Sequence, residues 1–264
     1  MKLITPEVYK IAETAINGVK MQEALEKLGY KNRAKTFPRA TTPAENLIEF
    51  AGRICYQSFE PGTVNPNISK IREDQYNYLE NIIKKGDGSI FEHATVSFLF
   101  MNVSRIFTHE LVRHRVGTAM SQESLRYVRP KELSLWLPIG VSEGDILEGM
   151  MNNFEHSENI FRFVEGGIDW NSISFDEKKI LTSAMRRMLP DGLATHIIWT
   201  ANHRALRHIL EMRTDPAAEV EIRFIFDKVG KILTNDYPGI YQDFVRTELK
   251  DGTGSWRPTL RSKI

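Results

Sequence analysis

The sequence is poor in several features that mark large classes of proteins. Its 264 residues include a single cysteine, Cys55, which excludes an internal disulfide framework and every zinc or iron–sulfur site built from several cysteines. Thirty-five lysines and arginines nearly balance 34 aspartates and glutamates, so the formal net charge is +1. This balance argues against a nonspecifically basic nucleic-acid binder, because such proteins carry a large positive excess.

Long hydrophobic runs are also missing. Stretches such as 96–103 are far shorter than the roughly 20 apolar residues that a membrane-spanning helix needs. The first ten residues, MKLITPEVYK, lack the apolar core of a secretory signal. Neither a GxGxxG motif nor a P-loop occurs, and the seven histidines lack the usual spacing of paired ligands, so we predict no Rossmann site and no metal. We expect a soluble, cytoplasmic protein with no membrane partner.

The hydropathy pattern predicts the α+β class, with a modest mixed sheet flanked by many helices. No repeat and no linker rich in Gly, Ser or Pro interrupts the sequence, so we predict a single domain over residues 1–264. Residues 18–41 are basic and loosely patterned, which predicts a surface insertion within that domain. Alternation of side chains predicts strands over residues 8–16 and 91–103.

Helix starts are marked by two capping boxes, Thr42–Glu45 and Ser174–Glu177. We predict Cys55, near the end of the first of these helices, to be a small core residue. From residue 145 onward the pattern is helical almost throughout. The other expected helices cover residues 74–85, 104–115 and 199–213, and a further one starts at Asp215-Pro216.

Arginine is concentrated between Arg113 and Arg129, where four arginines, a histidine and a Ser-Gln-Glu-Ser string share 17 residues. Arginine is always charged and offers a planar fork of donors, which suits phosphates and the edges of nucleobases. Hydroxyls and backbone amides of an adjacent loop add neutral donors around an anion. The segment therefore predicts either an anion site or a solvated basic turn.

The helix predicted before this segment places charge on an apolar face. At 100° per residue, Ile106, Phe107 and Leu111 form an apolar arc, and Glu110 and His114 project inside it. A buried carboxylate or imidazole must find partners. These two are then either members of a core ion pair or neighbours of a bound ligand.

The helix predicted over residues 199–213 shows the same conflict more strongly. Asn202 and Arg213 fall on its apolar side, about 16 Å apart along the axis. A buried guanidinium needs an anion, a pair of carbonyls or a solvated pocket, and the end of a neighbouring helix would also serve. This side therefore predicts an interface or a ligand cleft. The polar residues of the opposite side and its flank are His203, Arg204, Arg207, Glu211 and His208.

The string Arg113-His114-Arg115, followed by Ser121 to Tyr127 (SQESLRY), resembles the signature of the flavin-dependent thymidylate synthases. Four more segments resemble motifs of that family in the same order: GDGSIFEH (86–93), THELV (108–112), MRRMLP (185–190) and WTANHRALRHILEMR (199–213). One departure stands out. Eight residues separate Arg115 from Ser124, where the family signature has seven, and an extra residue could reshape a pocket.

The resemblance implies a thymidylate synthase-complementing-protein-like fold and a homotetramer with FAD at the subunit interfaces. It also implies synthesis of dTMP from dUMP, with 5,10-methylenetetrahydrofolate as carbon donor and NADPH as reductant. The implied FAD contacts are Ser89, Arg113, His114, Arg115, Gln122, Asn202, Arg204 and His208. The implied dUMP contacts are Glu110, Arg113, Gln122, Glu123, Ser124, Leu125, Arg126, Arg186 and Arg213, with Arg213 as the catalytic residue.

Two alternatives stay open at this point. The extra residue before Ser124 could redirect the enzyme, so that it leaves a hydroxymethyl group on dUMP or dCMP. The two arginine clusters could instead form a nonenzymatic nucleic-acid-binding module, which would show salt-dependent affinity and bind no flavin. The near-zero net charge counts against the second alternative, and we predict small-molecule partners with no nucleic acid.

Overall fold

A four-stranded antiparallel sheet runs along the long axis of the molecule, in the order β2-β3-β6-β4. The computed structural model describes residues 1–60, 65, 68 and 70–262. The strands of the central sheet are β2 (Glu7–Glu13), β3 (Thr95–Ser104), β6 (Ala194–Asn202) and β4 (Thr118–Gln122). Parallel pairing in the described ranges is confined to the two-residue strands β1 (Lys2–Leu3) and β5 (Ser134–Leu135). The α+β class is confirmed, and the central sheet is antiparallel throughout.

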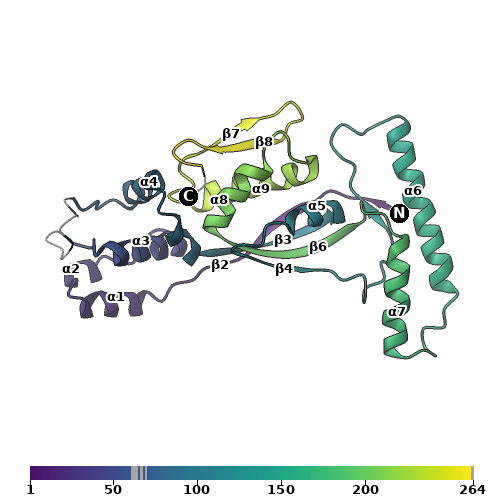
Figure 1. The fold of residues 1–264 in the computed structure, drawn as a ribbon, viewed down its shortest axis with the longest axis horizontal. Helices are drawn as coiled ribbons and strands as arrows, with labels where there is room; N and C mark the ends of the chain where they lie inside the picture. Colours follow the sequence, from purple (N-terminus) through teal and green to yellow (C-terminus); the bar gives the residue numbers. More distant parts are fainter. Residues whose placement is uncertain (61–64, 66–67, 69, 263–264) are drawn as a thin grey trace.

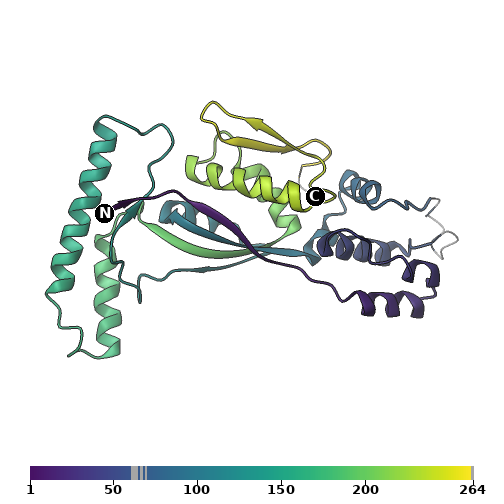
Figure 2. The same cartoon turned by 180° about the vertical axis from the view of Figure 1, so that it is seen from behind.

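Helices cover one face of this sheet and build the main core with it (Figures 1 and 2). Phe98 and Phe100 of β3 and Trp199 of β6 point to this face and are fully buried. The ring of Phe226 lies 5.9 Å from that of Trp199 and 6.3 Å from that of Phe100. The covering elements are α5 (Arg105–Leu111), α8 (His203–Arg213), α9 (Val220–Asp236) and the hairpin of β7 (Phe244–Glu248) and β8 (Gly254–Pro258).

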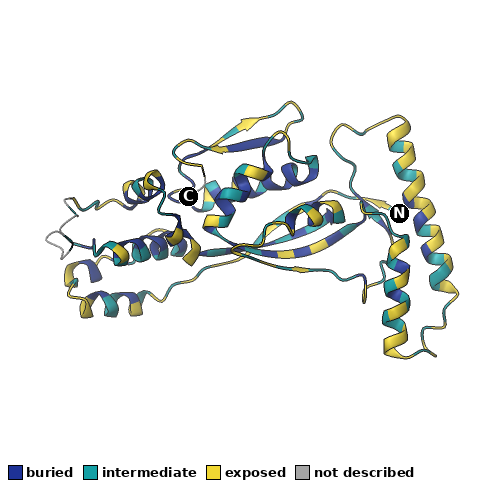
Figure 3. Cartoon of the chain, in the orientation of Figure 1, coloured by how far each residue is buried: buried dark blue, intermediate teal, exposed yellow. Residues whose placement is uncertain are grey.

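The remaining helices lie at the two ends of the sheet (Figures 1 and 2). One end carries α1 (Gly18–Lys27), α2 (Lys31–Ala34), α3 (Pro43–Tyr56), α4 (Gln75–Lys85) and the 3-10 helix η1 (Gly88–His93). The other end carries α6 (Asp145–Gly166), α7 (Phe175–Met185) and η2 (Arg186–Met188). Figure 3 shows that α6 and α7 leave much of their surface exposed. Among the described residues, no helix is both long enough and apolar enough to cross a bilayer.

Residues 18–41 form α1 and α2, which pack on α3 through a small apolar cluster of their own. Met21, Leu25 and Phe37 are buried there together with Phe59. This cluster is separate from the main core, so the segment depends on α3 and its neighbours rather than on the sheet.

The predicted helix starts agree with the structure. Thr42 and Glu45 form a complete capping box at the start of α3, and Ser174 and Glu177 form another at α7. These caps satisfy backbone N–H groups that have no partner inside the helix. Helix α4 ends at Gly86, whose φ of 82° is a left-handed conformation that glycine adopts without strain.

The C-terminal half contains more strand than predicted. The expectation of helix almost throughout from residue 145 is wrong, because β6, β7 and β8 all lie beyond it. The single helix expected over residues 199–213 is also wrong, since β6 runs through Asn202 and α8 begins at His203. Along β6, Thr195, Ile197 and Trp199 alternate with more exposed residues, which is the period of a strand and not of a helix.

Several smaller expectations need correction. Helix α5 ends at Leu111, so the segment from Arg113 onward lies in a turn and not in a helix. Ile106 is exposed, although Phe107 and Leu111 are buried as predicted. The helix expected from residue 215 starts at Val220. Cys55 is exposed and is not the core residue we predicted, because the helix α3 buries its opposite face.

Candidate functional site

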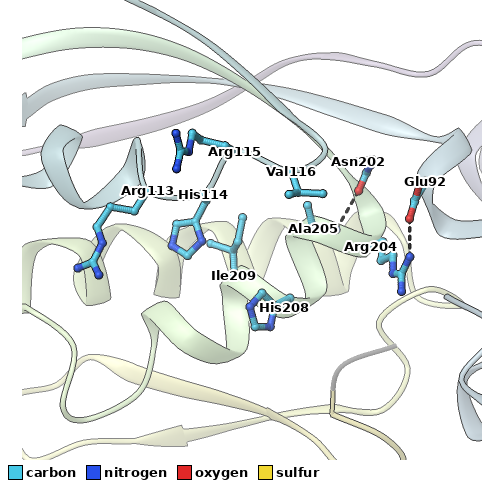
Figure 4. A pocket seen from close by; sticks show the side chains of 10 residues that line it. All are labelled: Glu92, Arg113, His114, Arg115, Val116, Asn202, Arg204, Ala205, His208 and Ile209. Atoms are coloured by element: carbon cyan, nitrogen blue, oxygen red, sulfur yellow. Dashed lines mark hydrogen bonds and ion pairs between the residues drawn. The ribbon is translucent and has the colours of Figure 1, made fainter. Parts of the chain in front are cut away.

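A cavity of about 400 Å³ opens between the turn after α5 and the start of α8 (Figure 4). The turn and α8 face one another across the cavity, and η1 closes one side with Glu92. The lining residues are Glu92, Arg113, His114, Arg115, Val116, Asn202, Arg204, Ala205, His208 and Ile209. Six of the eight residues that the family signature assigned to FAD are in this set.

The turn is fixed to the strand–helix junction by a close backbone contact. Gly117 has a φ of 71°, and its carbonyl oxygen accepts a hydrogen bond from the Asn202 N–H at 2.9 Å. A Cβ at Gly117 would lie 2.4 Å from Asn202 Nδ2, so only glycine fits without displacing that side chain. Asn202 in turn caps α8, because its Oδ1 accepts from the Ala205 N–H at 2.8 Å. Gly117 thereby couples the Arg-His-Arg turn to the start of α8.

The lining is strongly cationic. It includes three arginines against one carboxylate, that of Glu92, which pairs with Arg204 at the edge of the cavity. Guanidinium groups bind phosphates through charge-assisted, often bidentate hydrogen bonds. The cavity is therefore suited to an anionic ligand, with Ile209 and Ala205 supplying apolar surface.

Behind the cavity wall, Arg213 is buried against Glu110 and His114. The Nε–H of Arg213 donates to Nε2 of His114 at 2.7 Å, and Nη2 donates to the backbone oxygen of Glu110 at 3.1 Å. The carboxylate of Glu110 forms an ion pair with Nη1. Arg213 is 8% exposed, so its prediction as a buried arginine is confirmed, and the internal partners that it needs are Glu110 and His114.

Burial beside Arg213 determines the protonation state of the His114 imidazole. Burial and the charge of Arg213 lower the pKa of His114 to about 4, because both disfavour a second positive charge. Since Nε2 accepts from Arg213, the proton of the neutral ring is on Nδ1. Burial lowers the pKa of Arg213 as well, and Glu110 opposes that effect. The guanidinium is held in place by one charged and two neutral acceptors.

Two of the five polar residues expected on the opposite side and flank of α8 are buried within the protein. His203 is fully buried and its Nδ1 lies 3.0 Å from the Tyr241 hydroxyl. Arg207 is 3% exposed and forms two bonds of 2.7 and 2.8 Å to the Asp243 carboxylate. The segment that follows α9 covers this side of the helix, which a single helical wheel could not reveal. Of the predicted set, Arg204 and His208 line the cavity instead.

The other predicted site residues lie outside this cavity. Ser89 is an exposed residue of η1. The pairing of Thr118 with Ala201 and of Gln122 with Ile197 puts the segment from Gln122 to Arg126 about 13 Å further along the sheet. Arg186 opens η2, at the end of the sheet that carries α6 and α7. One chain thus contains two groups of predicted site residues, one around the cavity and one beyond the end of β4.

Sequence reasoning missed three contributors. Glu92, whose carboxylate is the one acidic group of the lining, belongs to the GSIFEH string that we quoted but did not assign. Gly117 lies in the stretch between Arg115 and Ser124, where we noted one extra residue but gave the glycine no role, and residues 118–122 of that stretch pair with β6. Arg105 was not singled out, and its Nη1 is buried without a hydrogen-bond partner among the residues that the structure describes. A glycine two residues after the Arg-His-Arg motif was the only sequence signal for the second of these.

The fold and the cavity define an α+β protein with a cationic pocket. A family model described as thymidylate synthase complementing protein matches residues 39–239. The chain belongs to this family.

Curated relatives share the match over most of the chain. The flavin-dependent thymidylate synthase of Mycobacterium tuberculosis (strain ATCC 25618 / H37Rv) is 34% identical over 221 residues, which are 81% of this chain and 86% of the relative. The protein of the same name from Mycolicibacterium gilvum (strain PYR-GCK) is 35% identical over 213 residues, 78% of this chain and 82% of the relative.

Solved structures share the fold. The UMP/dUMP methylase PolB from Streptomyces cacaoi bound with 5-Br dUMP has a TM-score of 0.59 at 16% identity, covering 92% of this chain and 96% of its own. The same methylase bound with 5-Br UMP has a TM-score of 0.62, with 92% and 95% covered. At this identity the likeness concerns the fold alone.

Proposed function

We propose that this protein is a flavin-dependent thymidylate synthase. It methylates dUMP to dTMP, with 5,10-methylenetetrahydrofolate as carbon donor and NADPH as reductant, and its flavin is FAD. The observation that carries the proposal is the cavity, because residues far apart in the sequence that belong to separate family motifs meet there. Membership of the family, with relatives named for this activity, supports it.

The cavity residues fit a flavin dinucleotide. Arg113, Arg115 and Arg204 would meet the pyrophosphate with charge-assisted donors, since they are the main charges of the lining. Asn202, His114 and His208 would supply further hydrogen bonds, and Ser89 and Gln122 would contact the same cofactor outside the cavity. When bound and reduced, the flavin supplies the hydride of the reaction.

Arg213 is the residue that we assign to the pyrimidine. Its guanidinium would lie against the carbonyl and N3 edge of the uracil and stabilise negative charge as the ring is activated. Glu110 and His114 already hold it in one orientation, so little reorganisation is needed when the substrate binds. His114 lies between this arginine and the proposed flavin cavity. Its Nε2 accepts from Arg213, and its side chain is part of the cavity lining.

The group beyond β4 would bind the rest of dUMP. Ser124 already orders its own loop, since its backbone oxygen accepts from the N–H groups of Tyr127 and Val128 at 3.0 and 2.9 Å. The Ser124 hydroxyl also accepts from the Arg126 N–H at 3.3 Å, and its own proton would be donated to a phosphate dianion beside the Arg126 guanidinium. The proposed dUMP residues of this group are Gln122, Glu123, Ser124, Leu125, Arg126 and Arg186.

The separation of the two groups supports a site that is completed between copies of the chain. We propose a homotetramer in which the phosphate group of one subunit meets the cavity of another. The sheet offers a surface for such contact: Tyr9, Leu99 and Ile198 form one cross-strand row, and Tyr9 and Ile198 are 45% and 43% exposed. Sedimentation equilibrium of the full chain tests the assembly, and a monomer with full activity would contradict it.

Product analysis tests the activity. The protein is incubated with FAD, NADPH, 5,10-methylenetetrahydrofolate and either dUMP or dCMP, and the nucleotide product is identified by mass spectrometry. We expect dTMP from dUMP and no product from dCMP. A hydroxymethylated nucleotide would contradict the proposal in favour of hydroxymethyl transfer. Failure to bind FAD, together with salt-dependent binding of DNA or RNA, would contradict it in favour of nucleic-acid binding.

A further inference from the structure

Residues 259–262, which follow β8, lie between the end of α4 and α8 (Figures 1 and 2). On one side, the Ser262 hydroxyl donates to the carboxylate of Glu211 in α8 at 2.8 Å. On the other side, Nη1 of Arg261 donates to the backbone oxygen of Lys85, the last residue of α4, at 3.1 Å. The segment therefore bridges two helices that are distant in the sequence.

The bridging segment is anchored on the α8 side. The N–H and the hydroxyl of Thr259 donate to the backbone oxygen of Asp243 at 2.7 and 3.0 Å. The Asp243 carboxylate is itself bound by Arg207 of α8, and Leu260 packs against the main core. Because Asp243 and Arg207 are both buried, this part of the segment is fixed, and Arg261 extends from it to α4.

Arg261 contacts the turn that joins α4 to η1. Its guanidinium covers Gly86, since a Cβ there would lie 2.7 Å from Arg261 Cζ. The last carbonyl groups of a helix have no partner inside it and carry partial negative charge, so a guanidinium satisfies both. Helix η1 begins two residues later at Gly88, whose N–H donates to the Gly86 oxygen at 2.8 Å. Arg261 therefore holds the turn from which η1 starts.

The other end of η1 reaches the proposed flavin cavity. Glu92 lines the cavity and forms an ion pair with Arg204 of α8 (Figure 4). Directly after η1, the oxygen of Ala94 accepts from the His203 N–H at 3.0 Å. Hydrogen bonds of a 3-10 helix have poorer geometry than those of an α-helix, so the position of η1 depends on the contacts at both of its ends.

We propose that Arg261 is a positioning residue of the flavin site. It holds the turn before η1, and through η1 it keeps Glu92 and Arg204 in place at the edge of the cavity. The inference rests on the proposed function, because it takes FAD as the ligand of the cavity. It goes beyond that function, since Arg261 lies outside the residues 39–239 that the family model matches and is not part of the cavity lining.

The test measures FAD affinity, by quenching of flavin fluorescence, for the wild type, Arg261→Gln and Arg261→Lys. The melting temperature of each flavin-free protein is recorded as well. The matched control is Arg187→Gln, because Arg187 is also an exposed arginine that donates to a carbonyl in the last turn of a helix, that of Ser183 in α7. Ser262→Ala removes the bond to Glu211 and tests the same bridge if Arg261→Gln does not fold.

Arg261→Gln is expected to weaken FAD binding roughly three- to tenfold, the effect of one or two exposed hydrogen bonds. Arg261→Lys keeps a donor and the positive charge and should recover most of the loss, and Arg187→Gln should bind FAD as the wild type does. In a chain that already carries Glu92→Ala, Arg261→Gln should have little further effect, because both changes release the same edge of the cavity.

Three results would overturn the inference. An unchanged FAD affinity, with or without a lower melting temperature, would limit Arg261 to a structural role. Equal losses in the presence and absence of Glu92→Ala would mean that Arg261 does not act through η1, and an equal loss in Arg187→Gln would mean that the effect is not local. If the wild type does not bind FAD, the proposed function fails first, and the inference fails with it.

Discussion

Nε of Arg213 and Nε2 of His114 lie 2.7 Å apart, although 99 residues separate them in the chain. The contact joins the end of α8 to the turn after α5, and it places the arginine directly behind a wall of the cavity that we propose for the flavin. It also requires a neutral imidazole, because a protonated ring has no acceptor for the guanidinium N–H. Arginine, imidazole and the Glu110 carboxylate therefore behave as one unit, and the first two predictions concern this unit.

We expect Arg213→Ala to lose turnover by about 10²–10³-fold or more, because it removes a donor that stabilises developing charge in the transition state. Flavin should stay bound, since Arg213 is not among the residues that line the cavity. Steady-state kinetics and the absorbance of purified protein measure the two effects. Arg213→Lys serves as the control that keeps the charge. Loss of flavin together with activity would remove Arg213 from its proposed role at the pyrimidine.

The second prediction concerns the ionisation of His114. Its pKa of about 4 lies below the ordinary value of 6.5, so its contribution to stability is fully present above pH 6.5 and is lost as the pH falls towards 4. We expect the NMR signal of this histidine to show no titration between pH 5 and 8. In Arg213→Ala, the titration midpoint should move up towards 6.5, because solvent enters and a neighbouring charge is gone. His114→Gln identifies the signal, and a wild-type midpoint near 6.5 would contradict the contact.

The third prediction concerns Glu221, whose carboxyl group holds Ser104, the N-cap residue of α5. Glu221 is buried and accepts from the N–H of Ser104 at 2.7 Å as well as from its hydroxyl, and burial raises its pKa to about 7. Its contribution to stability is therefore fully present below about pH 4.5 and is lost as the pH rises through 7. Glu221→Gln cannot ionise and can still bond to Ser104. It should gain stability over the wild type with rising pH, by about 2–3 kcal/mol at pH 8.

Urea unfolding between pH 5 and 8 measures this difference. Glu155→Gln, an exposed position on the distant helix α6, is the matched control and should follow the wild type across the whole range. A constant difference between Glu221→Gln and the wild type at every pH would show that packing, and not ionisation, distinguishes them.

The fourth prediction concerns the backbone at Gly117. Gly117→Ala combines a left-handed backbone with a clash against Asn202, so we expect loss of the Asn202 cap and at least tenfold weaker flavin binding. Gly140→Ala is the control for backbone strain alone, because Gly140 also has a left-handed φ, of 90°, but no atom of the described residues lies within 4 Å of its Cβ position.

A double-mutant cycle locates the effect. If Gly117 acts through Asn202, Gly117→Ala should add little to the loss that Asn202→Ala causes alone, because both changes remove the same contact. Fluorescence quenching of the flavin on binding provides the affinities. Additive losses would mean that Gly117 shapes the cavity in some other way.

The local sequence determined those helix ends and strand faces that depend only on residues a few positions apart. The capping boxes at Thr42 and Ser174, the glycine that ends α4 and the alternating face of β3 were all predictable, because each depends on a hydrogen bond or side-chain direction set by near neighbours. Arg213 could be recognised as a buried charge for the same reason, since a helix fixes which of its residues share a face. Most of the cavity residues were predicted from the motifs in which they occur.

Tertiary structure decided which partner each of these groups meets. Pattern alone did not separate β6 from α8, because a short apolar run followed by an amphipathic helix mimics one longer helix. Burial of His203 and Arg207 depends on the segment after α9, so it cannot be predicted from the local sequence. Hydrogen bonds and charges act over a few ångströms of space, whereas the residues that supply them here are separated by tens of residues, and only the folded chain brings them within that range.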